Sequence, residues 1–429
     1  MQHFKPLTHA AAAAIPIHLE GRSVFALESK SISIGSQASI RAEIADAARF
    51  SSLQQQWDDL VLRSAELNPF FHPIMIAAAL GQASANEAPV VLGWQGERLV
   101  GVWPFISGHS RSGAPVRVLK APVHPTMANG TPVIDAAVAE PALSAMLDAI
   151  KSSAALPKIL SVSSCNGDGP LMTALHSACL SRGRGPAILR RSTRPYLACQ
   201  QNPDAYFAQA LSSSRRRKLG QLRRRLATRG HIELKVHRDH TTVSESLERF
   251  MRLEAKGWKA ISGNPLLGTD DGAFSRETMP QLALQGLVEI WELSLTGQAV
   301  SMAIVLRQGG TAFDWKITYD ETHGDCSPGV LLAHDYTTSF LSDDATDFAD
   351  SCAADDTGLL GPLWTGRQGM ADFLLDSRGN SATLLALTAI EALHAHARRL
   401  AKKALLRAPP KLGAFMTSLV LAARTASSS

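Results

Sequence analysis

Residues 315–332 read WKITYDETHGDCSPGVLL, and this stretch indicates the fold more clearly than any other. It runs from a strand through a polar loop into an apolar helix. Ser327 is a residue type favoured at an N-cap, and Pro328 suits the first helical position. A strand that leads into a helix N-terminus directs backbone N–H groups at the strand end, where they attract anions. The pattern predicts a site for the pyrophosphate of a nucleotide cofactor, the alternative being only a well-formed helix start.

The segments before this stretch predict a three-stranded antiparallel meander. The runs LVEIWELSL, AVSMAIVLRQ and TAFDWKITYD lie within residues 287–320 and are joined by two tight turns that contain glycine. Upstream, residues 212–230 (SSSRRRKLGQLRRRLATRG) predict a helix that is capped by serines and stopped by Gly230. A strand over 232–238 and an amphipathic helix over 241–259 follow it.

The first half of the chain repeats this order. Residues 41–66 predict a helix because apolar residues recur every three or four positions, and residues 88–107 predict a hairpin. Trp57 and Trp258 each lie in the helical region before the hairpin of their half. A helical region, a meander and a further helix is the order of an α+β fold. We therefore predict a duplicated module with an N-terminal arm (1–40), a first module (41–198), a second module (199–380) and a C-terminal helix with a tail (381–429).

Composition narrows the function classes. The 429 residues are 45% hydrophobic with a net charge of +5, and much of the basic excess lies in residues 215–225 and 398–407. A basic helix of this kind suits a phosphate-bearing ligand or a solvated face as well as a polynucleotide. The five cysteines are scattered, which argues against a zinc site or a disulfide framework. No run is apolar enough for a membrane span and no signal peptide is evident, so a cytoplasmic location is expected.

The chain resembles the GNAT acetyltransferase-like family that includes proteins associated with cellulose and exopolysaccharide biosynthesis and is related to the Fem-type aminoacyltransferases. The resemblance covers about residues 45–375. It implies two tandem GNAT-like modules, each a mostly antiparallel sheet flanked by helices, with acetyl-CoA or another acyl-CoA in the second. The motifs that carry it are Arg216–Leu226, Leu253-Glu254, Trp258-Lys259, Lys316, Tyr319-Asp320, Ser327–Gly329, Asp350, Trp364 and Arg367, with Trp57, Gly96–Gly101 and Gly130–Pro132 in the first half.

One departure concerns the donor site. The usual GNAT phosphate loop, Gln/Arg-x-x-Gly-x-Gly/Ala, is absent from both halves of the sequence, and Ser327-Pro328-Gly329 stands in the equivalent place with one glycine. The cofactor-binding residues that we predict are Ser327, Gly329, Val330 and Lys316. The departure leaves room for a donor other than acetyl-CoA.

Acyl transfer from a thioester to an amine needs a neutral amine, a polarised carbonyl and a proton for the departing thiolate. Asp314, Asp320 and Asp350 are the candidate bases, because a carboxylate in a partly buried cleft can have its pKa raised. Tyr319 is the candidate acid. Each also has an ordinary interpretation, since Asp320 suits a turn, Asp350 a strand end and Tyr319 a strand.

Candidate substrate contacts are Trp258 and Lys259 after a helix end, Arg216 on the basic helix, and Arg367. The alternatives are a tryptophan that covers the core and a helix whose charges are solvated. No metal is expected, since no cysteine or carboxylate stands at ligand spacing from His323 or His334.

The predicted function is an acyl-CoA-dependent N-acyltransferase whose acceptor is an amine, on a small molecule or on a polysaccharide or cell-envelope precursor. The alternative is an inactive GNAT-like binding or scaffold protein in exopolysaccharide biosynthesis. Specific nucleic-acid binding is not expected, because aromatic residues are not interleaved with the arginines. Residues 381–407 predict a helix with a basic end, suited to packing or to peripheral contact with a membrane surface.

Overall fold

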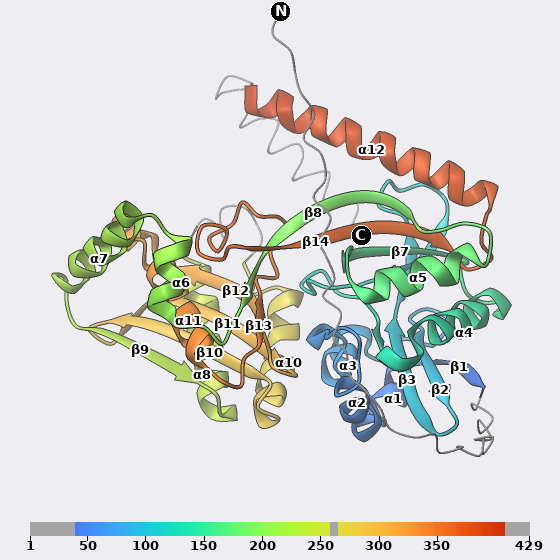
Figure 1. Cartoon of the computed structure of the whole chain (residues 1–429), viewed down its shortest axis with the longest axis horizontal. Helices are drawn as coiled ribbons and strands as arrows, with labels where there is room; N and C mark the ends of the chain where they lie inside the picture. The colour runs from blue at the N-terminus through green and yellow to red at the C-terminus, as the bar shows by residue number, and fades with distance from the viewer. Residues whose placement is uncertain (1–38, 258–264, 408–429) are drawn as a thin grey trace, which may run out of the picture. The chain divides into compact units, whose positions relative to one another are not determined.

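The computed structural model describes residues 39–257 and 265–407 (Figure 1). The predicted α+β class is confirmed, because helices flank mostly antiparallel sheets. The first half contains β1 (Ile40–Ala45), α1 (Ala47–Ser51), α2 (Gln54–Val61), α3 (Pro73–Leu80), β2 (Val90–Gln95), β3 (Arg98–Pro104), β4 (Ile106–His109), β5 (Arg117–Ala121), β6 (Val133–Ile134), α4 (Ala139–Ser152), β7 (Ile159–Asn166), α5 (Pro170–Leu180) and β8 (Ala187–Ala198).

The second half follows a similar plan after two additional helices. Its elements are α6 (Pro203–Ala210), α7 (Ser213–Ala227), β9 (Ile232–His237), α8 (His240–Glu254), α10 (Asp270–Leu284), β10 (Val288–Leu295), β11 (Gln298–Gln308), β12 (Thr311–Tyr319), the 3-10 helix η3 (Glu321–Cys326), α11 (Pro328–Ser342), β13 (Phe348–Asp350), β14 (Gly366–Asp376) and α12 (Ala382–Arg407). The predicted meander is β10, β11 and β12, and the predicted hairpin of the first half is β2 and β3.

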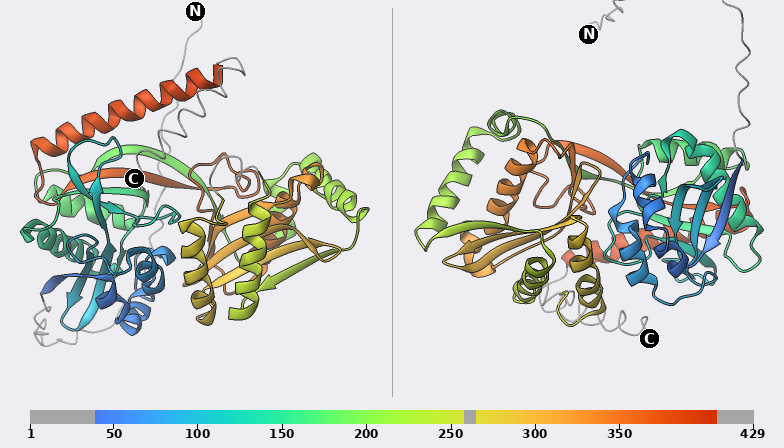
Figure 2. Two further views of the ribbon diagram at one scale, coloured as in Figure 1. Left: turned by 180° about the vertical axis from the view of Figure 1, so that it is seen from behind. Right: turned by 90° about the horizontal axis from the view of Figure 1, so that it is seen from below.

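The strands form a four-stranded sheet, in the order β1-β2-β3-β6, and a ten-stranded sheet, in the order β4-β5-β7-β14-β8-β13-β12-β11-β10-β9. The larger sheet joins the two halves because β14, from the second half, lies between β7 and β8 of the first. Figure 1 shows β8 and β14 as long neighbouring strands, and Figure 2 shows them from behind and from below. The sequence analysis predicted neither strand. The module boundary after residue 198 stays a proposal.

Each half contains one parallel strand pair, and in each pair the contact is short. Strand β5 pairs with β7 from Leu119↔Leu160 to Ala121↔Val162. Strand β12 pairs with β13 from Thr311↔Phe348 to Phe313↔Asp350. The pairing stops where β5 ends at Ala121 and where β13 ends at Asp350, whereas β7 and β12 continue. We call each of these points a divergence, and the two halves share this local geometry.

The prediction of a helix over residues 41–66 is wrong for the first residues of this range. Ile40–Ala45 form β1, which is antiparallel to β2 with Arg41 opposite Trp94. The helical part begins only after Asp46, whose carboxylate accepts a hydrogen bond from the Arg49 backbone N–H (2.8 Å) and caps α1. Strand pairing thus overrides the apolar spacing at the beginning of this segment.

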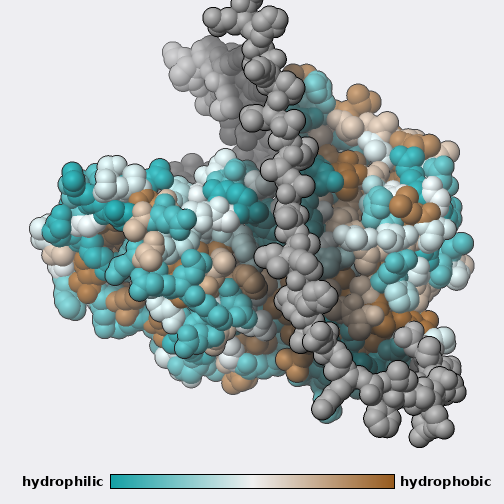
Figure 3. All heavy atoms as spheres, viewed as in Figure 1, coloured by the Kyte–Doolittle hydropathy of each residue, from teal (hydrophilic) through white to brown (hydrophobic). Residues whose placement is uncertain are grey.

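The core continues from one half to the other. Phe70 and Phe313 belong to the same buried cluster, with ring centroids 6.5 Å apart. A second cluster fills the space between the β10–β12 meander and helices α6, α7 and α11. The face of the second half seen in Figure 3 is largely hydrophilic. No helix within the described ranges is long and apolar enough to cross a membrane.

Candidate functional site

The divergence of β12 from β13 is the centre of the candidate site. Pairing stops at Phe313 and Asp350, whereas β12 continues to Tyr319. Trp315 forms a bulge in β12, since Ile304 opposes Lys316 while Val305 opposes Asp314. The Trp315 indole N–H donates to the carbonyl oxygen of Thr126 in the first half (2.7 Å). The bulge therefore bends the strand and ties it to the other half at the point of divergence.

Helix α11 begins beside this divergence, as predicted, but Ser327 does not cap it with its side chain. Ser327 has left-handed backbone angles (φ 49°, ψ 56°), and its hydroxyl lies 3.4 Å from the Gly324 carbonyl oxygen. The backbone N–H groups of Val330 and Leu331 donate instead to the Ser327 carbonyl (3.0 and 3.2 Å). The preceding 3-10 helix η3 fixes this arrangement, which the residue type alone did not reveal.

Gly329 is buried between two side chains. A Cβ atom at this position would lie 3.1 Å from Cδ1 of Tyr319 and 3.2 Å from Cδ1 of Leu359. Tyr319 ends β12, and Leu359 belongs to the segment that follows β13. The missing side chain therefore lets the first turn of α11 pack against these two residues. Ser327, Gly329 and Val330, which we predicted to bind the donor, thus lie together at the first turn of α11, and Tyr319 packs against Gly329.

The three predicted carboxylate bases have different surroundings. Asp314 faces α11 and accepts a hydrogen bond from the Tyr336 hydroxyl (3.2 Å). Burial, and then the neighbouring Asp314, raise the pKa of Tyr336. Asp320 caps η3 and accepts hydrogen bonds from the backbone and hydroxyl of Thr322 (2.9 and 2.6 Å). Burial alone would raise the pKa of Asp320, but these bonds outweigh it and lower the pKa, which makes Asp320 a weaker base.

Asp350 ends β13 and forms a buried ion pair. Its carboxylate lies 3.2 Å from Nη1 of Arg194 on β8 and also accepts from the Cys352 backbone N–H (2.8 Å). Arg194 in turn donates to the Ala128 carbonyl (3.1 Å). Arg194 and the Cys352 backbone thus orient this carboxylate at the divergence. Arg194 was not among the predicted residues, because its partner lies 156 positions away in the sequence.

A polar cavity of about 340 Å³ opens next to Asp350, between the two halves. Its wall includes Glu66, Asn166, Tyr196, Asp350, Phe313 and Gln368. Glu66 accepts a hydrogen bond from the Leu171 backbone N–H at the start of α5 (3.0 Å). Burial raises the pKa of Glu66 to about 7, although the bonds from Leu171 and the Asn166 side chain oppose the shift. Sequence reasoning missed Glu66, because nothing local distinguishes the last residue of the predicted 41–66 helix.

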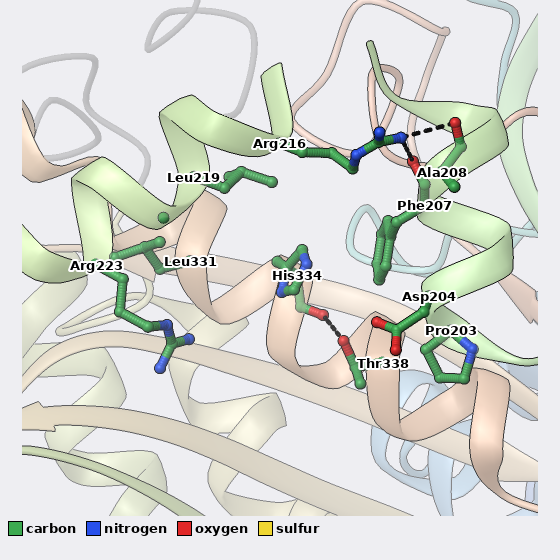
Figure 4. Close-up of a pocket in the computed structure, with 11 residues that line it drawn as sticks. Pro203, Asp204, Phe207, Ala208, Arg216, Leu219, Arg223, Leu331, His334 and Thr338 are labelled. Carbon is green, nitrogen blue, oxygen red and sulfur yellow. Dashed lines mark hydrogen bonds between the residues drawn. The ribbon is translucent and has the colours of Figure 1, made fainter. Parts of the chain in front are cut away.

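A second cavity, of about 540 Å³, lies between α6, α7 and α11 (Figure 4). Its wall is mostly apolar and includes Leu219, Leu331 and the stacked rings of Phe207 and His334, whose centroids are 4.4 Å apart. The guanidinium of Arg216 lies at this wall and donates to three backbone carbonyls at the end of α6, those of Phe207, Ala208 and Leu211 (3.3, 2.7 and 3.0 Å).

Other arginines of the basic helix are also engaged. Arg223 pairs with Asp335 of α11, while Arg225 and Arg229 both pair with Asp325 of η3. These ion pairs therefore hold α7 and the residues just after it against η3 and α11. Its remaining basic residues, among them Arg215 and Arg217, are exposed.

The remaining predicted residues are placed as follows. Lys316 lies 5.2 Å from the Trp315 ring centroid. Arg367 donates to the carbonyls of Trp364 (2.6 Å) and Gly361 (2.9 Å) and braces the segment before β14. Trp258 and Lys259 lie outside the described residues. Among the residues that are described, no cluster of three His, Cys, Asp or Glu side chains could hold a metal ion.

Comparison with known proteins finds a family match within the second half. Residues 213–348 match the family model described as "Acetyltransferase (GNAT) domain". No curated protein matches the chain. The crystal structure of FemX has a TM-score of 0.51 at 12% identity, covering 79% of this chain and 92% of its own. That likeness shows a shared fold.

Two further solved structures are similar at lower scores. The C-terminal domain of a putative lysylphosphatidylglycerol synthetase from Agrobacterium fabrum has a TM-score of 0.48 at 11% identity, covering 81% of this chain and 97% of its own. A tandem GNAT protein from the clavulanic acid biosynthesis pathway has a TM-score of 0.40 at 12% identity, covering 80% and 99%.

Proposed function

We propose, on the premise that residues 213–348 are a GNAT-type acetyltransferase domain, that the protein is an N-acyltransferase that uses acyl-CoA. The amine nitrogen attacks the thioester carbonyl carbon, the C–S bond breaks and an amide forms. A base takes the proton that the amine loses, and an acid returns a proton to the departing thiolate. This chemistry needs no covalent enzyme intermediate and no metal.

The donor is proposed to lie along β12 where it leaves β13. Ser327, Gly329 and Val330 would meet its phosphates at the first turn of α11, where the helix dipole favours negative charge. Lys316, on the same strand, would add a positive charge. Tyr319 is the proposed acid, because it ends β12 in contact with Gly329.

The observation that carries the proposal is the pKa of Glu66, which burial raises to about 7, in the cavity that adjoins Asp350. A general base is most effective when its pKa lies near the working pH, because it is then available as the carboxylate and still basic enough to take a proton. We propose that the acceptor amine enters this cavity, that Glu66 takes its proton and that Asp350 attracts the cationic form. Asp314 and Asp320 remain weaker proposals for the base.

The acceptor class follows less directly from the residues. An amine on a polysaccharide or cell-envelope precursor is proposed from the family resemblance, with Trp258, Lys259, Arg216 and Arg367 as substrate contacts. Arg216 and Arg367 already donate hydrogen bonds to backbone carbonyls. Each would contact the substrate through its other guanidinium N–H groups. Five free cysteines, four of them buried, support a reducing location such as the cytoplasm.

Membrane-surface contact through α12 is a further part of the proposed function. Leu384, Leu387 and Glu391 face the protein body, whereas Leu385 (46% exposed), Ile390 (41%), Leu393 (71%) and Leu400 (55%) are open to solvent. An amphipathic helix with an apolar face and basic residues binds anionic lipid surfaces. Residues 392–429 contain no Asp or Glu and carry Arg398, Arg399, Lys402, Lys403, Arg407, Lys411 and Arg424.

One observation favours an inactive binding protein as the second candidate. The first turn of α11 is covered by Tyr319 and Leu359, and the sequence has no glycine-rich loop to replace it. The two candidates differ in turnover. Thiol release from acetyl-CoA and longer acyl-CoAs, measured with a panel of amines, should depend on the amine and fall about 10²- to 10⁴-fold in Glu66→Gln. Donor binding without amine-dependent release would favour the inactive protein.

A further inference from the structure

The parallel strands β5 and β7 of the first half diverge in the same way as β12 and β13, and a second polar cavity lies at this point. It has a volume of about 400 Å³ and is lined by the ends of both strands and by the loop after β5. Its polar lining consists of Arg111, Lys120, His124, Ser161, Ser163 and Ser164. It is separate from the cavity beside Glu66, with which it shares no lining residue.

Lys120 is the unusual residue of this cavity. It is partly buried, yet neither a hydrogen bond nor an ion pair joins its ammonium group to any residue in the described ranges. Lys120 is opposite Ser161 in the strand register, so both side chains lie on the face that Ser163 shares two positions further along. A lysine that is taken partly out of water without a counter-charge costs stability, and a bound anion would supply that charge.

Arg111, which also lines the cavity, is held beside Ser163. Its guanidinium donates to the Asp372 carboxylate (3.1 Å) and to the Ser163 hydroxyl (2.6 Å). Asp372 is itself fixed by the Ser164 backbone N–H (2.8 Å). The loop that carries Arg111 is tied to α12, because the backbone and hydroxyl of Ser112 donate to Glu391 (2.9 and 2.8 Å). Arg111 is therefore oriented before any ligand arrives.

The third basic side chain, His124, is less available. Its ring stacks on Phe274 with centroids 4.1 Å apart, and Nε2 lies 3.7 Å from Asp271 of α10. Burial lowers the pKa of His124, so the imidazole is neutral near pH 7. Asp372 offsets Arg111, and the excess positive charge of the cavity comes from Lys120.

We propose that this cavity binds a small organic anion, with its oxyanion group, a phosphate or a carboxylate, between Lys120 and the serine hydroxyls and its remainder along Pro122 and Met127. The ammonium of Lys120 supplies the charge, and Ser161 and Ser163 supply hydrogen-bond donors. The cavity is larger than a bare phosphate needs, which points to an organic body. This site goes beyond the proposed acyl transfer and does not depend on it.

The test is a calorimetric titration of the full chain with inorganic pyrophosphate and, separately, with citrate. Lys120→Met keeps the length of the side chain and removes its charge, and Lys120→Arg retains the charge. Lys151→Met, at an exposed position of α4, is the matched control. We expect Lys120→Met to weaken binding about tenfold or more, since a bond to a charged group accounts for at least one such factor. Lys120→Arg should restore most of the affinity, and Lys151→Met should not change it.

The stability of Lys120→Met gives a second readout. Because Lys120 pairs with no residue of the described ranges, we expect the melting temperature of Lys120→Met to equal or exceed that of the wild type, whereas loss of a structural lysine would lower it. Tighter binding of pyrophosphate than of citrate would identify phosphate as the recognised group, and the reverse would identify carboxylate. Absence of binding of both anions, equal affinity in Lys120→Met and the wild type, or a clearly lower melting temperature would overturn the proposal.

Discussion

The guanidinium of Arg194 on β8 lies 3.2 Å from the carboxylate of Asp350 on β13, and both side chains are buried. The pair joins β8 of the first half to β13 of the second half. Because Asp350 also borders the cavity that contains Glu66, the same contact positions the proposed site. Its removal is therefore expected to affect folding and function together.

Arg194→Met should destabilise the protein by about 3–5 kcal/mol, since it leaves the Asp350 carboxylate buried without its partner. Urea unfolding followed by circular dichroism measures this change. Arg191→Met on the same strand is the control, because Arg191 is exposed and its ion pair with Asp168 is long, at 3.8 Å. The double variant Arg194→Met/Asp350→Leu should recover part of the loss. Equal effects at positions 191 and 194 would contradict a buried, mutually dependent pair.

Glu66 should make stability depend on pH. Its pKa is about 7 in the folded protein, against the ordinary value of 4.5, so folding disfavours its charged form. The protonated Glu66 side chain therefore contributes to the free energy of unfolding. This contribution is fully present below about pH 4.5 and is lost as the pH rises through about 7. Glu66→Gln cannot ionise at this position. As the pH rises from 4.5 to 8, its free energy of unfolding should therefore increase relative to that of the wild type by up to about 3 kcal/mol. Urea unfolding at a series of pH values measures this difference. If the free energies of unfolding of the two proteins change with pH in the same way, the pKa of Glu66 lies near its ordinary value.

The same group should control activity. If Glu66 takes the proton of the amine, kcat/KM of the wild type should rise through an inflection near pH 7. Glu66→Asp should retain the inflection with reduced activity, and Glu66→Gln should lose it. An unchanged profile in Glu66→Gln would assign the base to another residue, with Asp350 or Asp314 as the next candidates.

Gly329→Ala tests the first turn of α11. The added Cβ would lie 3.1 Å from Tyr319 and 3.2 Å from Leu359, so these neighbours of the proposed donor-binding turn must give way by a few tenths of an ångström. We expect weaker acyl-CoA binding and a slightly lower melting temperature. Valine is a poorer choice, because its methyl groups would clash with the same neighbours. Gly324→Ala in η3 is the control, since its Cβ would meet nothing within 4 Å. Equal donor affinity in both variants would move the donor away from α11.

Leu393→Glu tests the α12 surface. It places a charge in the exposed apolar stripe, where Leu393 is 71% exposed, without touching the face that packs on the protein. Flotation with vesicles that contain anionic lipid should show binding by the wild type and strongly reduced binding by the variant. Leu62→Glu is the control, because Leu62 is 83% exposed on a different helix end. Equal flotation of wild type and Leu393→Glu, or binding to neutral vesicles alone, would rule out this surface.

Much of the fold could be predicted because its signals are local. The β10–β12 meander and the β2–β3 hairpin follow from strand runs between glycine turns, and α11 follows from Pro328 after a polar loop. The strand β1 was missed, because the apolar spacing of 41–66 resembles a helix and only pairing with β2 distinguishes it. The strand β14 was missed for a related reason, since its partners β7 and β8 lie in the other half of the chain.

The candidate site could be predicted only in part. Tyr319, Ser327 and Gly329 were predicted to lie close together, because a strand end and a helix start adjoin in the sequence, and their role in the site stays a prediction. Glu66 and Arg194 were not found, since the first owes its raised pKa to burial against α5 and the second owes its role to Asp350, far away in the sequence. Side chains brought together by tertiary contacts leave no local pattern.

Calorimetric titration of the purified protein with acetyl-CoA and with longer acyl-CoAs tests the acyltransferase proposal most directly, because donor binding does not require the acceptor to be known. We expect saturable binding of one acyl-CoA per chain, weakened in Gly329→Ala and unchanged in Lys120→Met and Leu393→Glu. Titrations in which no acyl-CoA binds, or in which binding persists undiminished when the first turn of α11 is altered, would contradict a donor site at β12 and α11.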